Sequence, residues 1–226
     1  MKLQQLTPHV WGGSVWLPVP VMIWFAREKE GITIVDGGVL PMWEGVRRAL
    51  RETFAGLPLR RVLLTHGHQD HIGILPPLMD AYPEVPIVVH REEIPFLTGS
   101  RSYRSLREGV WARYAPPVPE EKLTALRLEA SYAGLQPYWT PGHSPGHTVF
   151  YHEADDILLA GDLFTRYFGR LQRPIAGFTA DMELSLSSGS ILEELKPKYT
   201  ASAHLGVTRD AHLQYSRLLP PLLSGR

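Results

Sequence analysis

The stretch that most constrains the fold of this chain is Thr65–His71, which carries three imidazoles and a carboxylate within six residues. An apolar run, 62–64, directly precedes it. A helix would distribute positions 66, 68, 70 and 71 around its axis, whereas a strand that ends in a tight loop can direct all four side chains to one point. Gly67 is expected to relax that turn. The pattern therefore predicts a metal site, and a histidine-rich surface loop is the alternative interpretation.

Composition narrows the classes of protein that fit this pattern. The chain has 226 residues, 44% of them hydrophobic, and a formal net charge of zero. We expect one domain over residues 1–226 with a substantial core, and no broad surface for nucleic acid. There is no cysteine, so any metal must be held by His, Asp or Glu. The sequence shows neither a signal peptide nor a membrane span, and we expect a cytoplasmic protein.

Strand and helix patterns alternate along the chain, which favours sheets flanked by helices. The two halves follow the same plan of strands, then a polar loop, then a helix. Expected strands are 21–26, 32–35, 61–65, 87–89, 136–140, 148–152, 157–160 and 199–203. Expected helices are 41–54, 76–82, 181–195 and 208–219.

Residues 91–126 interrupt this alternation with charged, aromatic and proline-rich sequence. We expect helical excursions and loop rather than sheet here, forming an insertion that covers the site. Exposed Trp111 and Tyr114 could line a pocket or a contact between two copies of the chain. A homodimer is therefore one open interpretation.

Further metal donors follow later strands. His143 lies in a Gly- and Pro-rich loop, Asp162 follows Gly161, and His204 follows the last expected strand. Loops at the carboxyl ends of neighbouring strands bring polar groups together. A four-coordinate zinc would leave several donors unused, so two divalent metal ions fit better. The seven candidate ligands are His66, His68, Asp70, His71, His143, Asp162 and His204.

These motifs resemble the metallo-β-lactamase-fold hydrolase superfamily, in particular its glyoxalase II-like branch, from Asp36 to His204. The resemblance implies an α/β fold, the αββα four-layer sandwich, with the site along one edge of the sheets. It also implies two groups of ligands joined by a bridging carboxylate, with Asp36 supporting them from behind. The implied ligands are His66, His68 and His143 for the first metal, Asp70, His71 and His204 for the second, and Asp162 for both.

The chemistry implied by two such cations is hydrolysis. They lower the pKa of a shared water, and the bridging hydroxide then attacks an electrophile. Asp70 is the catalytic candidate that orients this water or accepts its proton. The leading hypothesis is cleavage of a small-molecule ester, thioester or lactone. Zinc is the expected metal, with iron or manganese as alternatives. Tyr167 is a weak candidate for substrate binding, and loop packing is its alternative role.

Other interpretations remain open. The residues after Asp162 supply core elements, so the resemblance implies an enzyme lacking the glutathione-binding C-terminal region of glyoxalase II. A mononuclear iron enzyme like the persulfide dioxygenases, a phosphodiesterase and a non-catalytic metal-binding module are the alternatives. Ser144 is the only candidate for a serine nucleophile. His147 is expected to be structural. Four further histidines are expected to lie on the surface or to be packed, namely His9, His90, His152 and His212.

Overall fold

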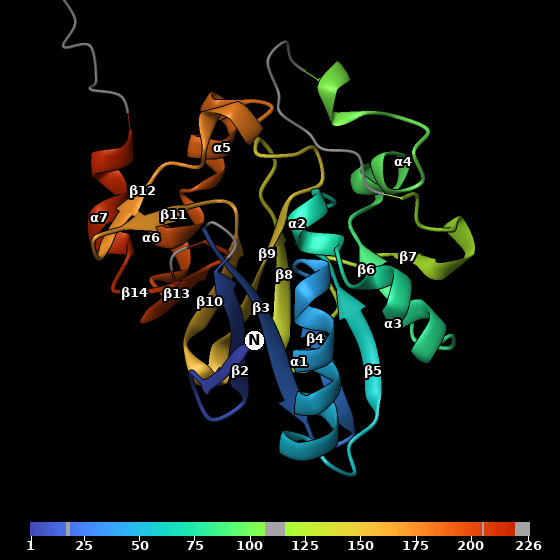
Figure 1. The fold of residues 1–226 in the computed structure, drawn as a ribbon. Helices are drawn as coiled ribbons and strands as arrows, with labels where there is room; N and C mark the ends of the chain where they lie inside the picture. The colour runs from blue at the N-terminus through green and yellow to red at the C-terminus, as the bar shows by residue number, and fades with distance from the viewer. Residues whose placement is uncertain (17–18, 107–115, 205, 220–226) are drawn as a thin grey trace, which may run out of the picture.

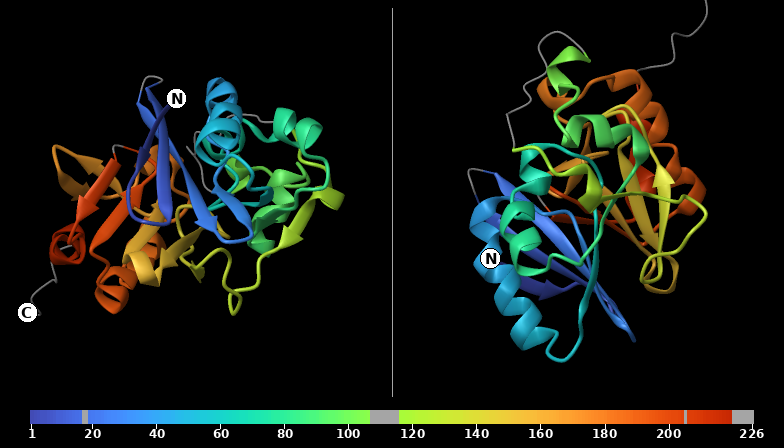
Figure 2. Two further views of the ribbon diagram at one scale, coloured as in Figure 1. Left: turned by 90° about the horizontal axis from the view of Figure 1, so that it is seen from below. Right: turned by 90° about the vertical axis from the view of Figure 1, so that its right-hand side faces the viewer.

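Two β-sheets packed face to face form the centre of the molecule, and helices cover the outer face of each sheet (Figure 1). The computed structural model describes residues 1–16, 19–106, 116–204 and 206–219. Figure 2 shows the layers from two further directions. The arrangement is the α/β, four-layer αββα sandwich that the family resemblance implies.

The first sheet is antiparallel over its first four strands and parallel from the fourth strand to the last. Two of its parallel strands, Gly31–Val35 and Ile87–Val89, are short, apolar and fully buried, as expected of strands covered on both faces. Its strands, in spatial order, are β1 (Lys2–Gln5), β2 (Val10–Trp16), β3 (Pro20–Glu28), β4 (Gly31–Val35), β5 (Leu59–Leu63), β6 (Ile87–Val89) and β7 (Leu123–Ala125). The helices of this half are α1 (Trp43–Arg48), α2 (Gln69–Ile72), α3 (Leu75–Ala81) and α4 (Ile94–Leu97).

The second sheet is antiparallel except where β10 and β13 run side by side in parallel. Its order is β14 (Gly206–Arg209), β13 (Tyr199–Ser202), β10 (Ile157–Gly161), β9 (Thr148–His152) and β8 (Leu135–Trp139). A separate hairpin consists of β11 (Thr165–Tyr167) and β12 (Arg170–Gln172). The helices of this half are α5 (Met182–Ser188), α6 (Ile191–Leu195) and α7 (His212–Tyr215).

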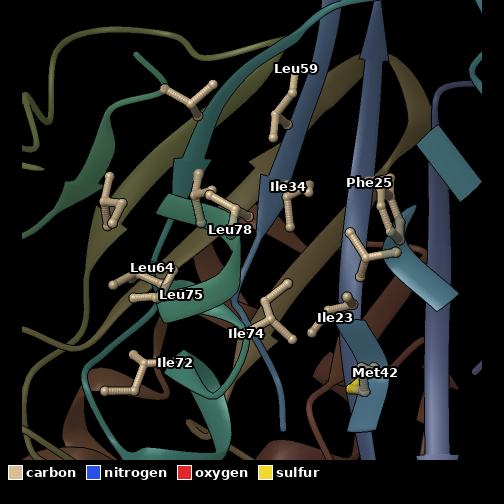
Figure 3. Packing of buried hydrophobic residues seen from close by; sticks show 14 of the residues in the cluster. Ile23, Phe25, Ile34, Met42, Leu59, Leu64, Ile72, Ile74, Leu75 and Leu78 are labelled. Atoms are coloured by element: carbon tan, nitrogen blue, oxygen red, sulfur yellow. The ribbon is translucent and has the colours of Figure 1, made fainter. Parts of the chain in front are cut away.

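Buried apolar side chains fill the spaces between the four layers. Figure 3 shows the cluster between the first sheet and its helices, where Ile23, Phe25 and Ile34 face Leu75 and Leu78. A second cluster, which includes Trp24, Leu63 and Phe150, lies between the sheets. A third joins the second sheet to α5, α6 and α7. These contacts fix the strand ends from which the site is built.

The N-terminal half also contains strands that the sequence analysis did not predict. β1 is a polar edge strand, and β2 contains Gly12 and Gly13, so neither shows the apolar alternation of a typical strand. The expectation that residues 91–126 contain no sheet is wrong at one point, because β7 pairs with β6. The expected helix at 76–82 is confirmed as α3, with proline in its first turn.

Two expected helices of the C-terminal half differ from the structure. Asp181 caps α5 through a hydrogen bond from the Leu184 amide, as predicted. The helix ends at Ser188, however, and Leu184 is exposed rather than on the buried face. A side chain at Gly189 would collide with the Tyr215 ring, so this glycine permits close packing of α7. In place of a helix beginning at Thr208, the chain forms β14 and then α7.

The two halves are also joined far from the strand ends that carry the metal donors. The buried Asp155 carboxylate accepts hydrogen bonds from the Thr7 hydroxyl at 2.5 Å and the His9 amide at 2.7 Å. The His9 ring lies 2.7 Å from the same carboxylate and stacks on His152. His9 is thus an exposed histidine and His152 a packed one, as expected. Within the described ranges, no helix is long and apolar enough to cross a membrane.

Candidate metal centre

The seven candidate ligands form three overlapping clusters, and each ligand lies just after a strand of one of the two sheets. His66 and His68 follow β5, while Asp70 and His71 lie on the short helix α2. His143 lies in the loop between β8 and β9. Asp162 follows β10, and His204 follows β13. The helix α2 differs from the expected loop, but its four residues still direct two donors toward the same point.

One group of donors consists of His66, His68 and His143. Nδ1 of His68 lies 2.9 Å from Nε2 of His66 and 3.0 Å from Nε2 of His143. All three side chains are buried. Burial lowers the pKa of His68 to about 4 and holds those of His66 and His143 well below the usual range. These rings are therefore neutral near pH 7, which is the form that binds metal.

A second group consists of Asp70, His71 and His204, whose donor atoms lie within 4.8 Å of one another. Asp162 lies between the two groups. Its Oδ2 is 3.5 Å from Nε2 of His143 and 3.4 Å from Nε2 of His204, and its Oδ1 is 3.4 Å from Nε2 of His71. One carboxylate thus faces donors of both groups.

Charges in the second group differ from those in the first. Burial would lower the pKa of His204, but Asp162 outweighs that effect and raises it to about 10. The pKa of His71 is likewise raised, against burial, by Asp36 and Asp162. Burial would raise the pKa of Asp162, yet His204 and His71 hold it well below the usual range. Without metal, this group therefore pairs imidazolium rings with carboxylates.

The outward nitrogens of four rings are occupied, which leaves Nε2 for the site. Nδ1 of His71 donates to Asp36, and Nδ1 of His204 donates to the Pro20 carbonyl at 2.9 Å. His66 and His143 direct Nδ1 to the hydroxyls of Thr65 and Thr179. Such contacts orient metal-binding histidines in proteins.

Two buried atoms at the centre of the site show how well this donor set fits a metal. Within the part of the chain that the structure describes, Nε2 of His71 and Oδ1 of Asp162 are buried and form an ion pair at 3.4 Å, but neither makes a hydrogen bond. Buried polar atoms in proteins are nearly always paired. A cation between them would supply the missing partner, so the donor set fits the predicted metals.

Asp36 lies behind the ligands, as the resemblance implies, and connects two of them. Its carboxylate accepts hydrogen bonds from the Thr65 amide at 2.8 Å and from Nδ1 of His71 at 2.8 Å. The Thr65 hydroxyl also donates to it. The expected role of Gly67 is wrong, because Gly67 is not among the glycines with positive φ. A side chain there would collide with the Tyr103 hydroxyl and Leu97, so Gly67 provides space rather than a turn.

Replacing Asp36 with asparagine should weaken metal binding about 10- to 100-fold and lower the free energy of unfolding by about 1–3 kcal/mol. The Asn amide group would face either the Thr65 amide or Nδ1 of His71, and both of these are donors. Metal titration and denaturant unfolding measure the two effects. Asp36 has a φ of 64°, which asparagine also tolerates. The control is Asp210→Asn, at another aspartate with positive φ; equal losses in both variants would contradict the prediction.

The remaining predicted residues lie outside the two groups. Tyr167 is 60% exposed on the β11–β12 hairpin, where its ring contacts Phe168. His147 is buried, with Nδ1 at the Thr140 hydroxyl and Nε2 accepting from the Asp162 amide. Both of its nitrogens are used, in agreement with the expected structural role. Trp111 and Tyr114 lie outside the described residues.

Sequence reasoning missed two residues beside the first group. The Glu93 side chain is fully buried and contacts the loops that carry His66, His68 and His143. The Tyr103 and His68 rings form a T-shaped pair, with centroids 4.6 Å apart. Both come from the segment 91–126, where nothing in the sequence distinguishes Glu93 from its exposed neighbour Glu92.

The fold and the donor set agree with the family to which the sequence belongs. The family model of the Metallo-beta-lactamase superfamily matches residues 16–204. The chain is therefore a member of the metallo-beta-lactamase superfamily.

Relatives with names and solved structures extend this assignment. The probable metallo-hydrolase YybB of Bacillus subtilis is 37% identical over 213 residues, covering 90% of this chain and 91% of YybB. The probable metallo-hydrolase YflN of the same organism is 28% identical, covering 86% and 83%. The crystal structure of TTHA1623 in a di-iron-bound form superimposes with a TM-score of 0.70 at 26% identity, covering 93% of this chain and 99% of that one.

Proposed function

We propose that this chain is a dinuclear metal-dependent hydrolase that cleaves a small ester, thioester or lactone. One observation carries the proposal, namely that the Asp162 carboxylate faces His143 of one donor group and both His71 and His204 of the other. A shared carboxylate between two donor groups suits a pair of cations. The two Bacillus relatives named probable metallo-hydrolases support this class of reaction. Within the superfamily, we place the chain in the glyoxalase II-like branch.

Zinc is the metal we propose, because imidazole and carboxylate donors suit it. The same donors suit iron, and the di-iron-bound form of TTHA1623 makes iron the first alternative. When bound, the two cations would lower the pKa of a water molecule and polarise the carbonyl group of the substrate.

The chain's own residues would orient the reactants. The Asp70 side chain is 41% exposed, with one oxygen 3.4 Å from Nε2 of His204. Burial would raise the pKa of Asp70, but His204 and His71 outweigh it and hold the pKa well below the usual range. The ionised carboxylate can accept a hydrogen bond from the attacking water and orient it. Ser144 donates its hydroxyl to Glu93, which argues against a serine nucleophile. Tyr167 remains a proposed substrate contact.

Elemental analysis followed by a substrate panel tests the proposal. We expect two cations per chain and metal-dependent turnover of a thioester, ester or lactone, in preference to a phosphodiester. His68→Ala and Asp70→Ala should each abolish turnover without unfolding the protein, because each removes a donor from the site. Asp80→Ala is the control, since this exposed aspartate lies on α3 away from the site.

Several outcomes would contradict the proposal. Full activity in either site variant would refute the assigned roles. A single iron per chain with oxygen consumption would favour the dioxygenase alternative, and two zinc ions per chain would exclude it. Turnover of phosphodiesters alone would favour a phosphodiesterase.

A further inference from the structure

Glu93 is a buried carboxylate that the proposed reaction does not use. It follows Arg91 and Glu92, both exposed, in the turn before α4. The Glu93 side chain is 0% exposed. A buried charge is costly unless donors surround it, so its partners should reveal its role.

Four hydrogen-bond donors surround this carboxylate. Oε1 accepts from the Ser144 hydroxyl at 2.6 Å and from the Gly146 amide at 2.7 Å. Oε2 accepts from the Gly67 amide at 3.0 Å and from the Tyr103 hydroxyl. An ionised carboxylate has about four lone-pair sites, so all four bonds can form at once.

Three of these four hydrogen-bond donors belong to the two loops of the first ligand group. Gly67 lies between His66 and His68, so its amide belongs to the peptide between two ligands. Ser144 directly follows His143, and Gly146 is close behind. One oxygen of Glu93 therefore holds the loop from the first half of the chain, and the other oxygen holds the loop from the second half.

The packing around Glu93 allows its carboxylate to approach both loops closely. A side chain at Gly146 would lie 2.8 Å from Cγ of Glu93, so only glycine allows the carboxylate to come this close. The Tyr103 ring stacks on Phe96, with centroids 4.4 Å apart, and also makes a T-shaped contact with the His68 ring. The hydroxyl bonded to Glu93 thus holds in place a ring that also limits how His68 can turn.

We propose that Glu93 is a positioning residue that sets the separation of the His66–His68 loop from the His143 loop and so determines affinity for the first cation. Tyr103 assists by fixing the ring of His68. The inference rests on the proposed metal-binding role of these histidines but not on the nature of the substrate.

Glu93→Gln is the most direct variant because it keeps size and shape. An amide has only one oxygen, so either the Gly67 amide or the Gly146 amide must face an NH₂ group. The loop on that side loses its acceptor. The control is Glu92→Gln, which makes the same change at the adjacent exposed residue.

The test uses cobalt(II) as the probe, with no substrate. A competing chelator measures affinity, the visible absorption spectrum reports ligand geometry, and thermal unfolding of the metal-free protein reports stability. We expect Glu93→Gln to weaken binding of the first cobalt ion by about 10- to 100-fold and to change its spectrum. Glu92→Gln should match the wild-type protein in both measurements.

A purely structural role predicts a different result. If Glu93→Gln lowers the unfolding temperature but leaves cobalt affinity within about threefold of the control, with an unchanged spectrum, the proposal is overturned. If Glu93→Gln does not fold, Ser144→Ala and Tyr103→Phe decide, since each removes one hydroxyl donor. Each should weaken cobalt binding, and unchanged affinity in both would overturn the proposal.

The result also separates this inference from the proposed function. A wild-type protein that binds cobalt but cleaves nothing in the panel refutes hydrolysis, while the Glu93 comparison still stands. A wild-type protein that binds no cobalt refutes both.

Discussion

Replacing Asp162 with alanine is expected to lower hydrolysis on the order of a thousandfold or more. The reason is that its two oxygens face His71, His143 and His204, which come from three separate segments. The variant should also bind fewer cations than the wild type. Steady-state kinetics and elemental analysis of the same preparation measure both effects.

The Asp162→Ala variant should still fold. The amide of residue 162 donates to Nε2 of His147, and this bond does not depend on the side chain. Asp162→Asn provides a matched comparison, because it keeps the size but loses the charge and one acceptor. An alanine variant that retains two cations and activity within about tenfold of wild type would contradict the assigned role.

The second large effect concerns pH. The affinity of the Asp70, His71 and His204 group for a cation should fall about a hundredfold for each pH unit below the pKa values of its histidines. In the metal-free protein, neighbouring carboxylates raise the pKa of His204 to about 10 and that of His71 well above its ordinary value. A cation must therefore displace a proton from each ring.

The sign of this effect follows from linkage. A raised pKa means that folding stabilises the protonated imidazole ring. This stabilisation is fully present at pH values below the pKa of an unfolded histidine, which is about 6.5. It is lost as pH rises through the folded value, which is about 10 for His204. Protons thus compete with metal at the second group throughout the neutral range, and a divalent cation replaces two protons without changing the charge of the group.

The first group provides an internal control for this prediction. His66, His68 and His143 have lowered pKa values, so the first cation should bind with little dependence on pH near neutrality. Metal titrations at several pH values, repeated in buffers with different ionisation enthalpies, would count the protons released. Equal pH dependence for both cations would contradict the predicted protonation states.

Much of the site could be predicted because its donors are densely spaced in the sequence. The run from His66 to His71 is too dense in metal-binding side chains to be explained as packing. The later metal donors follow strands whose carboxyl ends lie at the same edge of the sheets. The ligand assignments stay predictions, but the structure brings all seven side chains together. Asp36 was placed by family resemblance, and its hydrogen bond to His71 supplies the physical reason.

Other features depend on contacts between distant residues, and local sequence does not encode them. Glu93 and Glu92 are adjacent and chemically identical, and only the folded chain buries one of them. The sequence predicts a turn role for Gly67, because the collision that a side chain there would have with Tyr103 arises across 36 positions of sequence. Strand β14 was missed because its short run is partly polar. The role of residues 91–126 as a cover stays a prediction, since 107–115 lie outside the described ranges.

The division of the donors between the two sheets has a consequence for synthesis of the protein. Four donors precede residue 72, and the other three follow residue 142. Each group takes members from both sides of this gap, so a partly synthesised chain cannot complete either one. High-affinity capture of metal must therefore wait until both sheets have packed. An unfinished or misfolded chain lacks the reactive centre, which makes the hydrolytic chemistry conditional on completed folding.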